Sequence, residues 1–246
     1  MQTFYFTDPG KVRSHNEDNV TIISNDKNEY ILAVADGMGG HKAGEKASGI
    51  AIDKICEEFY KLDTIGTKED AIDFLRKLVQ DINKSIFDYT KIHPESKGMG
   101  TTLVIAIKTN DYILYGNIGD SSGYVIKNGE LYKVTKDHTL VNLLVSTGEL
   151  TEEEAKYHPR KNVLMRALGA NDPIDIDIFD VDTSVRGLFL CSDGLTNMLT
   201  DEQIEKTLNS DLSIEEAVVK LIRKSNSRGG NDNISIAYLK KESGDL

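Results

Sequence analysis

The stretch Ile31-Leu-Ala-Val-Ala-Asp-Gly-Met-Gly-Gly40 joins a short apolar run to a carboxylate and a glycine-rich turn. The same order recurs in Leu188-Phe-Leu-Cys-Ser-Asp-Gly194. Each apolar run has the length of one buried strand, so we expect two strands that end in Asp-Gly at one end of a sheet. Carboxylates held close together on rigid elements repel one another unless cations offset their charge. The pattern therefore predicts a hard-cation site with Asp36 at its centre.

The overall charge limits the partners. The chain of 246 residues has 29 basic and 40 acidic side chains and a net charge of −11, which argues against a surface for nucleic acid or anionic membrane. No apolar run approaches the ~20 residues of a membrane span, and the first residues lack the pattern of a signal peptide. The two cysteines, Cys56 and Cys191, lie in different kinds of segment and are expected to be buried thiols. We expect a cytoplasmic protein.

Periodic apolar residues predict helices on either side of a β-rich middle. Residues 44–62 show helical spacing, and Thr67 followed by Asp70 resembles the start of a second helix. Three further pairs resemble later helix starts: Thr151 with Glu154, Thr200 with Gln203, and Ser213 with Glu216.

Strands are expected at intervals along the chain, with mostly antiparallel pairing. Asn128-Gly129 is a strong hairpin signal between residues 123–127 and 130–134. No repeat or linker interrupts the chain, so we expect one domain over residues 1–246, with a weakly periodic excursion at about 136–172. The other expected strands are 4–6, 20–23, 101–107, 111–118, 174–179, 188–191 and 234–239.

Four aspartates lie at strand ends or tight turns, and Glu17-Asp18 follow the first turn. Taken singly, each Asp beside Gly is typical of a turn cap. Together they favour a Mg²⁺ or Mn²⁺ site, because these ions take oxygen ligands and retain several waters. Glycine after Asp36 would let the main-chain carbonyl of Gly37 approach an ion closely. The four aspartates are Asp36, Asp120, Asp193 and Asp232.

Other catalytic patterns are missing. A cysteine phosphatase needs Cys-x5-Arg, but Leu62 and Asn197 stand six residues after the two cysteines. The glycines at 37–40 are only partly similar to a dinucleotide fingerprint, since Lys42 takes the place of the third glycine. There is no Walker sequence and no HExxH-type histidine pair for zinc.

As a set, these residues resemble the metal-dependent Ser/Thr protein phosphatases of the type-2C (PPM) family in their compact bacterial form. The resemblance covers nearly the whole chain, in the family's order. The matching segments are Thr7-Asp8-x-Gly10-x-Val12-Arg13-x-x-Asn16-Glu17-Asp18, Asp36–His41, Gly44-Glu45-x-Ala47-Ser48, Gly100–Thr102, Gly119–Ser121, Cys191–Leu195 and Asp232-Asn233.

The resemblance implies an α+β fold, a four-layer α-β-β-α sandwich of two mostly antiparallel sheets flanked by helices. The resemblance implies that the excursion at about 136–172 is a flap beside the active site; an ordinary surface excursion is the alternative. The resemblance also implies a binuclear Mn²⁺ or Mg²⁺ centre at one end of the sandwich, and a third, weaker ion. The expected activity is hydrolysis of phosphoserine and phosphothreonine in proteins by a metal-activated water.

Roles carry over by motif. Asp36 would bridge two ions, the Gly37 carbonyl would bind one, and Asp193 and Asp232 would bind the other. Asp120, with Asp193, would hold the third ion.

Three further residues complete the implied site. Glu17 would contact an ion through water, and Asp18 would support the site. Arg13 would grip the phosphate, because a guanidinium can fork onto two phosphate oxygens. The alternative for Arg13 is a surface ion pair with Glu17 or Asp18.

The proton donor to the leaving alcohol is left open by the sequence. Animal and plant relatives have histidine directly after Asp-Gly, where this chain has Met38. His41 is the nearest substitute; a structural role for His41, or a metal-bound water as the acid, are the alternatives.

The implied partners are phosphorylated proteins, with a Ser/Thr kinase and its substrates in bacterial signalling, and the chain is expected to be a monomer. Two other functions compete: a non-catalytic module that kept the fold, and a metal-dependent phosphodiesterase or nuclease. Intact ligands disfavour the first, and the net charge of −11 disfavours the second.

Overall fold

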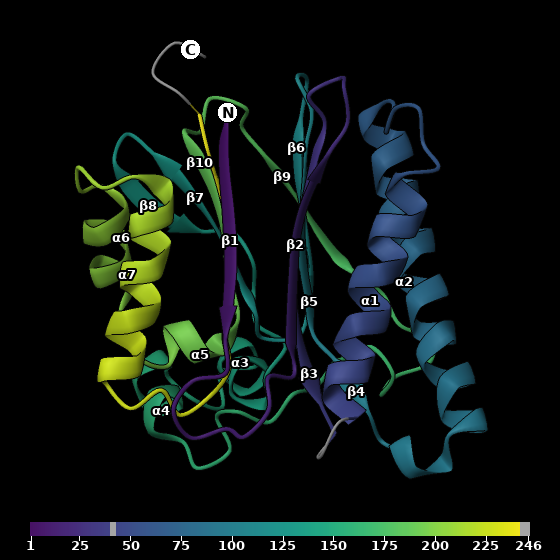
Figure 1. The fold of residues 1–246 in the computed structure, drawn as a ribbon. Helices are drawn as coiled ribbons and strands as arrows, with labels where there is room; N and C mark the ends of the chain where they lie inside the picture. The colour runs from purple at the N-terminus through teal and green to yellow at the C-terminus, as the bar shows by residue number, and fades with distance from the viewer. Residues whose placement is uncertain (40–42, 242–246) are drawn as a thin grey trace.

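In the computed structural model, which describes residues 1–39 and 43–241, two antiparallel sheets stack face to face (Figure 1). One sheet has five strands in the order β1-β11-β10-β7-β8. Their bounds are β1 Gln2–Asp8, β7 Ser122–Lys127, β8 Glu130–Lys133, β10 Gly187–Cys191 and β11 Ile234–Lys240. The expected hairpin between β7 and β8 is present, with Asn128 at a positive φ of 54°.

The second sheet follows the order β2-β3-β5-β6-β9, and the short β4 pairs with the end of β3. Apolar residues from both sheets meet in a buried layer between them, which includes Leu32, Tyr115 and Leu190. The strand bounds are β2 Asp18–Ser24, β3 Tyr30–Met38, β4 Gly100–Thr101, β5 Leu103–Lys108, β6 Ile113–Ile118 and β9 Asp177–Val181.

Helices cover the outer face of each sheet. The long helices α1 (Ala43–Phe59) and α2 (Lys68–Ile92) pack on the six-stranded sheet, and α6 (Asp201–Leu208) and α7 (Ile214–Ser227) pack on the five-stranded sheet (Figure 1). Each pair of helices contributes apolar stripes to one shared core beneath it. The expected α-β-β-α layering is therefore confirmed.

Four helix starts are set by local chemistry that the sequence predicted. Thr67, Thr151, Thr200 and Ser213 each form a capping box with the residue three positions later. In such a box the hydroxyl and the later side chain satisfy main-chain N–H groups that the helix leaves unpaired. Hydrogen bonds between residues three positions apart set these helix starts, so the helix starts can be predicted from the sequence without knowledge of the fold.

Some predicted boundaries are wrong. The first helix stops at Phe59 instead of continuing to residue 62, and β9 begins at Asp177 instead of 174. Ile174 and Ile176 are buried in the core beneath α2 and act as packing residues outside a strand. The predicted strand at 101–107 is divided at Thr102, where the Asp36 N–H donates to the Thr102 hydroxyl, at 3.0 Å, between β4 and β5.

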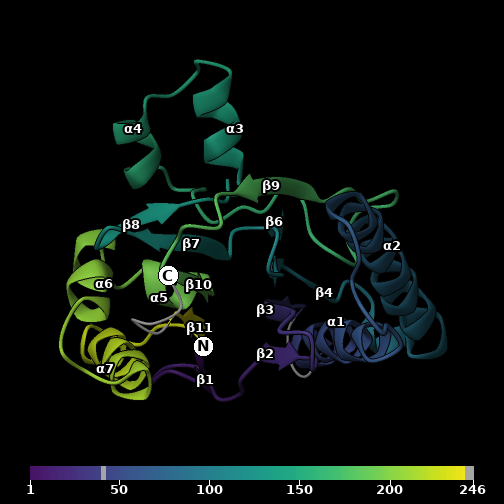
Figure 2. The ribbon, with the colours of Figure 1, turned by 90° about the horizontal axis from the view of Figure 1, so that it is seen from above.

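The segment 136–172 carries two short helices that stand apart from the sheets, beyond β8 and β9 (Figure 2). The capping box at Thr151 predicts α4 (Glu152–Tyr157), whereas α3 (Leu140–Ser146) was not predicted. In the described part of the chain, no helix is both long enough and apolar enough to cross a membrane.

Replacing Ile82 by Ala is expected to destabilise the protein by about 2–5 kcal/mol, because Ile82 on α2 is fully buried and its removal leaves a cavity. Ile92 on the same helix is 76% exposed, so Ile92→Ala should change the free energy of unfolding by less than about 0.5 kcal/mol. Urea denaturation of both variants checks this. Equal losses in the two variants would contradict the packing of α2.

Candidate metal centre

Asp36 lies near the end of β3, where β2 and the residues Thr101 and Thr102 fix its main chain. In the β2–β3 ladder Asp36 stands directly opposite Asp18. The Asp36 N–H donates to the Thr102 hydroxyl at 3.0 Å, and the Asp36 carbonyl accepts from the Thr101 hydroxyl at 2.9 Å. These bonds hold the Asp36 backbone rigidly at one end of the sandwich.

Asp193 comes from the facing sheet. It follows β10 and opens the short helix α5 (Asp193–Thr196), whose N-cap residue is Ser192. The expectation that both Asp-Gly turns lie on one sheet is therefore wrong: Asp36 belongs to the six-stranded sheet and Asp193 follows a strand of the five-stranded sheet. Both buried runs are central strands, and the sequence alone does not say that each is central to a different sheet.

A buried hydrogen bond joins the two sheets at this end. The Ser192 hydroxyl donates to Asp18 Oδ2 at 2.7 Å and accepts from the Ser235 N–H at 2.9 Å. Asp18, which faces Asp36 in the ladder, is thereby tied to the residue just before Asp193.

Asp232 enters from the turn before β11, and its neighbour Asn233 holds the N-terminal loop in place. The Asn233 amide donates to the carbonyls of Pro9 and His15, each at 2.9 Å, and its oxygen accepts from the Glu17 N–H at 2.8 Å. The loop that carries Arg13 and Glu17 is thus fastened beside Asp232.

Arg13 forms an ion pair with Asp232, with 2.8 Å between Nη2 and Oδ2. The pair with Glu17 or Asp18 that the sequence allowed is not the one observed; a carboxylate 219 positions along the chain is the partner. The Arg13 side chain is 52% exposed, so its remaining N–H donors face solvent.

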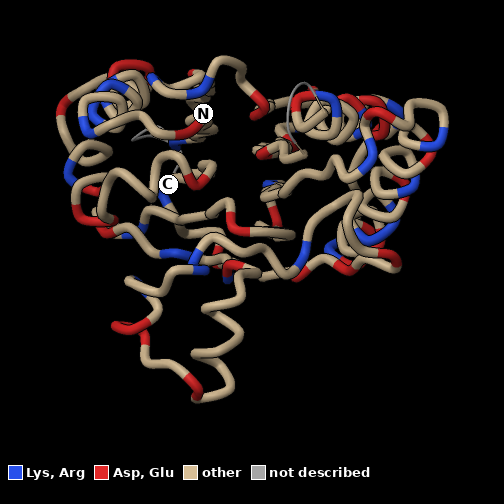
Figure 3. Tube along the Cα trace, turned by 90° about the horizontal axis from the view of Figure 1, so that it is seen from below, with Lys and Arg blue, Asp and Glu red and all other residues tan. Residues whose placement is uncertain are grey.

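Asp120 lies in the turn between β6 and β7. Gly119, at a φ of 105°, gives this turn a conformation that favours glycine. In the five-stranded sheet Ser122 pairs with Cys191, so the turn reaches the region just before Asp193. The structure thus brings Asp36, Asp193, Asp232 and Asp120 to one end of the sandwich, and acidic segments of both halves meet there when the molecule is viewed from below (Figure 3).

The pKa values of these carboxyls reflect their burial and their mutual repulsion. Burial, and then repulsion from Asp18, Asp193, Asp120 and Asp232, raise the pKa of Asp36 well above its ordinary value. Burial raises the pKa of Asp18 to about 7, although hydrogen bonds from serine oppose the shift. Burial, and next the repulsion of Asp232, raise the pKa of Asp193.

Two outlying carboxyls behave in the same way. Burial, followed by repulsion from Asp193 and Asp137, raises the pKa of Asp120 to about 7, and Lys133 opposes the shift. Burial raises the pKa of Glu17, and the charge of Arg13 opposes this. A positive charge at the centre would relieve all of these groups together.

The donor set fits a hard cation. Asp18 Oδ1 and Asp193 Oδ1 are buried and accept no hydrogen bond from the described residues. A Cβ at Gly37 would lie 2.2 Å from the Gly44 carbonyl oxygen and 2.5 Å from the Glu17 carbonyl oxygen, so only glycine fits between these two carbonyls. Unsatisfied carboxylate oxygens are ligands that Mg²⁺ and Mn²⁺ prefer.

The protein supplies only part of a coordination sphere. Within residues 1–39 and 43–241, no three Asp, Glu, His or Cys side chains converge closely enough to hold an ion by themselves. Mg²⁺-type ions usually keep several waters and need only one or two carboxylates each, so a site shared with water is consistent with this arrangement. His41, the predicted proton donor, lies outside the described residues.

The structure adds supporting residues that the sequence reasoning missed. Asn197 donates to Asp193 Oδ2 at 2.9 Å. Asn197 stands four residues after Asp193, a spacing that brings two side chains together on one face of a helix, so the sequence contained the signal for this contact. Lys133 and Asp137 also influence Asp120, but only the folding of β8 beside β7 brings them there.

Comparison with known proteins agrees with this site. The protein phosphatase 2C family matches residues 11–234. The chain is 42% identical over 242 residues to the serine/threonine phosphatase stp of Listeria welshimeri, covering 98% of this chain and 96% of that protein. It is 35% identical over 241 residues to the protein phosphatase PhpP of Streptococcus pneumoniae, covering 97% of each.

Solved structures give the same result. The S. agalactiae serine/threonine phosphatase superposes with a TM-score of 0.92 at 33% identity, covering 98% of this chain and 99% of that chain. The phosphatase Stp1 from Staphylococcus aureus superposes with a TM-score of 0.91 at 34% identity, covering 98% and 95%. With its carboxylates gathered from two facing sheets and its whole length matched, the chain belongs to the protein phosphatase 2C family of metal-dependent serine/threonine phosphatases.

Proposed function

We propose that this phosphatase hydrolyses phosphoserine and phosphothreonine in proteins at a centre of two Mn²⁺ or Mg²⁺ ions, with a third, weaker ion beside them. The observation that carries the proposal is the meeting of Asp36 and Asp193 from two sheets, with buried carboxylate oxygens at Asp18 and Asp193 left without donors. When bound, the ions would activate water for attack on phosphorus and offset the negative charge of the phosphate.

Each residue has a role in this proposal. Asp36 would be shared by the two ions, the Gly37 carbonyl would bind one of them, and Asp193 and Asp232 would bind the other. Glu17 contacts an ion through water. Asp120 together with Asp193 holds the third ion. Asp18 supports the site through its bond to Ser192, at 2.7 Å.

Arg13 binds the phosphate of the substrate. Asp232 holds one edge of its guanidinium at 2.8 Å, and the half-exposed remainder faces solvent. A planar guanidinium that is fixed on one side presents its other donors to two phosphate oxygens with little loss of conformational freedom. The role of His41 as proton donor to the leaving alcohol stays a prediction, as Met38 has no titratable group.

The proposal extends to the biological setting. The substrates are phosphorylated proteins, the counterpart is a bacterial Ser/Thr kinase, and the enzyme acts as a monomer in the cytoplasm. Cys56 and Cys191 are free thiols, which suits a reducing compartment.

Hydrolysis assays test the activity. Purified protein with Mn²⁺ should hydrolyse p-nitrophenyl phosphate and a phosphothreonine peptide, and EDTA should stop both reactions. Bis-p-nitrophenyl phosphate should be a poor substrate. No turnover with any divalent ion would overturn the proposal, and preference for the diester would favour a phosphodiesterase.

Asp36→Asn is expected to abolish hydrolysis and the rise in melting temperature that Mn²⁺ produces. The change keeps the shape of the side chain but removes the central charge, so the fold should persist without EDTA-sensitive stabilisation. Thermal melts with and without Mn²⁺ measure this. Asp26→Asn, at an exposed position, is the matched control and should behave like wild type. A metal response that survives in Asp36→Asn contradicts the assignment.

Asp120→Ala is expected to keep tight binding of two ions and to lose much of the hydrolysis rate, since Asp120 is placed at the third ion only. Calorimetric titration with Mn²⁺ counts the ions, and the same samples are assayed with the phosphothreonine peptide. Wild-type turnover in this variant would count against a catalytic third ion.

Stability in EDTA should fall as the pH rises from about 4 to about 7. Folding raises the pKa values of Asp18 and Asp120 from 3.8 to about 7, so the folded chain binds more protons than the unfolded chain in this window. Urea denaturation at a series of pH values measures the slope. Mn²⁺ should make the free energy of unfolding depend less on pH, and so should the double variant Asp18→Asn with Asp120→Asn. An unchanged pH dependence in the double variant would exclude these two carboxyls as its source.

A further inference from the structure

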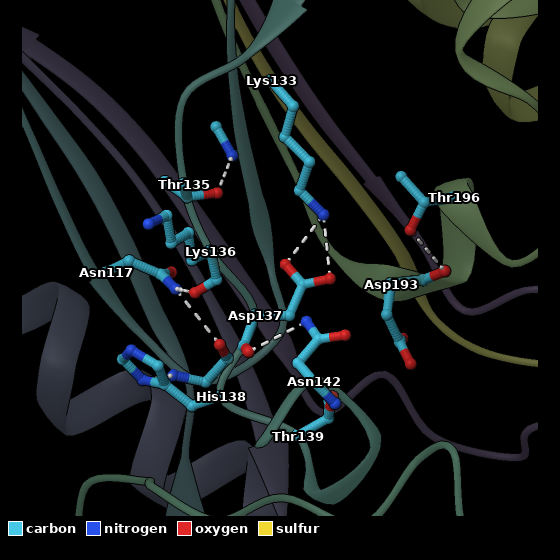
Figure 4. Close-up of polar contacts among 12 residues, drawn as sticks. Asn117, Lys133, Thr135, Lys136, Asp137, His138, Thr139, Asn142, Asp193 and Thr196 are labelled. Carbon is cyan, nitrogen blue, oxygen red and sulfur yellow. Dashed lines mark hydrogen bonds and ion pairs between the residues drawn. The ribbon is translucent and has the colours of Figure 1, made fainter. Parts of the chain in front are cut away.

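The positively charged side chain of Lys133 lies beside the candidate metal centre. Lys133, the last residue of β8, places its Nζ 2.8 Å from each carboxylate oxygen of Asp137 (Figure 4). The ammonium thus sits between both oxygens of Asp137. Neither residue belongs to the ligand set proposed above.

Hydrogen bonds fasten Asp137 to the turn that carries Asp120. On one side of Asp137, the Asn117 amide donates to the Lys136 carbonyl at 2.9 Å. On the other side, the His138 N–H donates to the Gly119 carbonyl at 2.9 Å, and the Gly119 N–H donates to His138 Nδ1 at 3.1 Å. Residues 136–138 therefore run along residues 117–119, and Asp137 is held next to the start of the Asp120 turn.

The strand register brings Asp193 to the same place. Tyr124 of β7 pairs with Lys133 on one side and with Phe189 of β10 on the other. Ser122, two residues after Asp120, pairs with Cys191, two residues before Asp193. In the close-up, the Lys133–Asp137 pair and the Asp193 side chain are seen in the same region (Figure 4).

The ion pair is reachable from solvent. Lys133 and Asp137 line a pocket of about 910 Å³ between the end of β8 and the helices α3 and α4. The side chains of Lys133 and Asp137 are 33% and 25% exposed, although the Oδ1 atom of Asp137 is itself buried. An ion pair in such a position contributes little to folding stability, which leaves its electrostatic effect on the neighbouring carboxylates as its main consequence.

We propose that Lys133 is a tethered cation that weakens the third metal ion, and that Asp137 both holds Lys133 in place and partly offsets its charge. Lys133 already supplies positive charge next to Asp120, so a divalent ion gains less by binding there. Asp137 opposes Lys133, because its negative charge favours the ion. The inference rests on the third ion of the proposed function.

The two partners of this ion pair should have opposite effects. Lys133→Gln removes a positive charge and leaves Asp137 free, so the third Mn²⁺ should bind more tightly. Asp137→Asn removes a negative charge and leaves Lys133 unpaired, so the third Mn²⁺ should bind more weakly. A unit charge within about 6–10 Å of a divalent ion in a solvated site changes its affinity by roughly threefold to tenfold.

Calorimetric titration with Mn²⁺, supported by electron paramagnetic resonance of free Mn²⁺, gives the number of bound ions and the affinity of the weakest. Lys133→Arg keeps the charge and should bind like wild type, and Lys133→Gln with Asp137→Asn should return close to it. Lys127→Gln is the matched control, because Lys127 makes a similar ion pair with Asp182, at 2.8 Å, but lies at the far end of β7 from Asp120.

Opposite shifts in the two single variants support the inference. Shifts in the same direction mean that the pair acts only by holding the 136–138 segment, and no shift means that its charge does not reach the ion; either result overturns the inference. If wild type binds two ions and hydrolyses the peptide, the third ion and this inference both fail while the phosphatase function stands. If wild type binds no ion, the proposed function itself fails.

Discussion

The structure depends on an excess of negative charge that the protein does not neutralise by itself. Several carboxylates are held close together, partly out of water, on two facing sheets. Asp36 and Asp18 stand opposite each other in one ladder, and Asp193 and Asp232 follow and precede strands of the other sheet. The raised pKa values of Asp18, Asp36 and Asp193 reflect the loss of hydration and the repulsion between the carboxylates. Such a site opposes folding in proportion to its charge and favours whatever cation it can bind.

What keeps the carboxylates from moving apart is neutral hydrogen bonding around them. Ser192 ties Asp18 to the other sheet, Thr102 holds the Asp36 backbone, and Asn233 fastens the loop of Arg13. These side chains carry no charge and take no part in the chemistry proposed. They fix positions on rigid strands, which is why the charged groups stay arranged for a ligand while repelling one another.

An acidic protein that acts on phosphate needs a positive electrostatic potential at its active site. The net charge of −11 repels a phosphate dianion, and the proposed ions and Arg13 are the local sources of attraction. Lys133 is a further positive charge at the edge of this site. Its partner Asp137 belongs to the segment 136–172, which also carries the helices α3 and α4. The candidate metal centre, the segment 136–172 and β8 thus influence one another electrostatically.

The sequence alone determined the features that depend on neighbouring residues. The capping boxes, the Asn128-Gly129 hairpin and the buried runs before Asp36 and Asp193 follow from short-range bonding and from apolar periodicity. The ordered set of motifs was sufficient to name the family. The tertiary structure decided what depends on strand order: that the two Asp-Gly turns come from different sheets, that Arg13 pairs with Asp232, and that Lys133 and Asp137 lie beside Asp120. Arg13 and Asp232 lie 219 positions apart, so the packing of the sheets chooses such partners, and no local pattern in the chain records that choice.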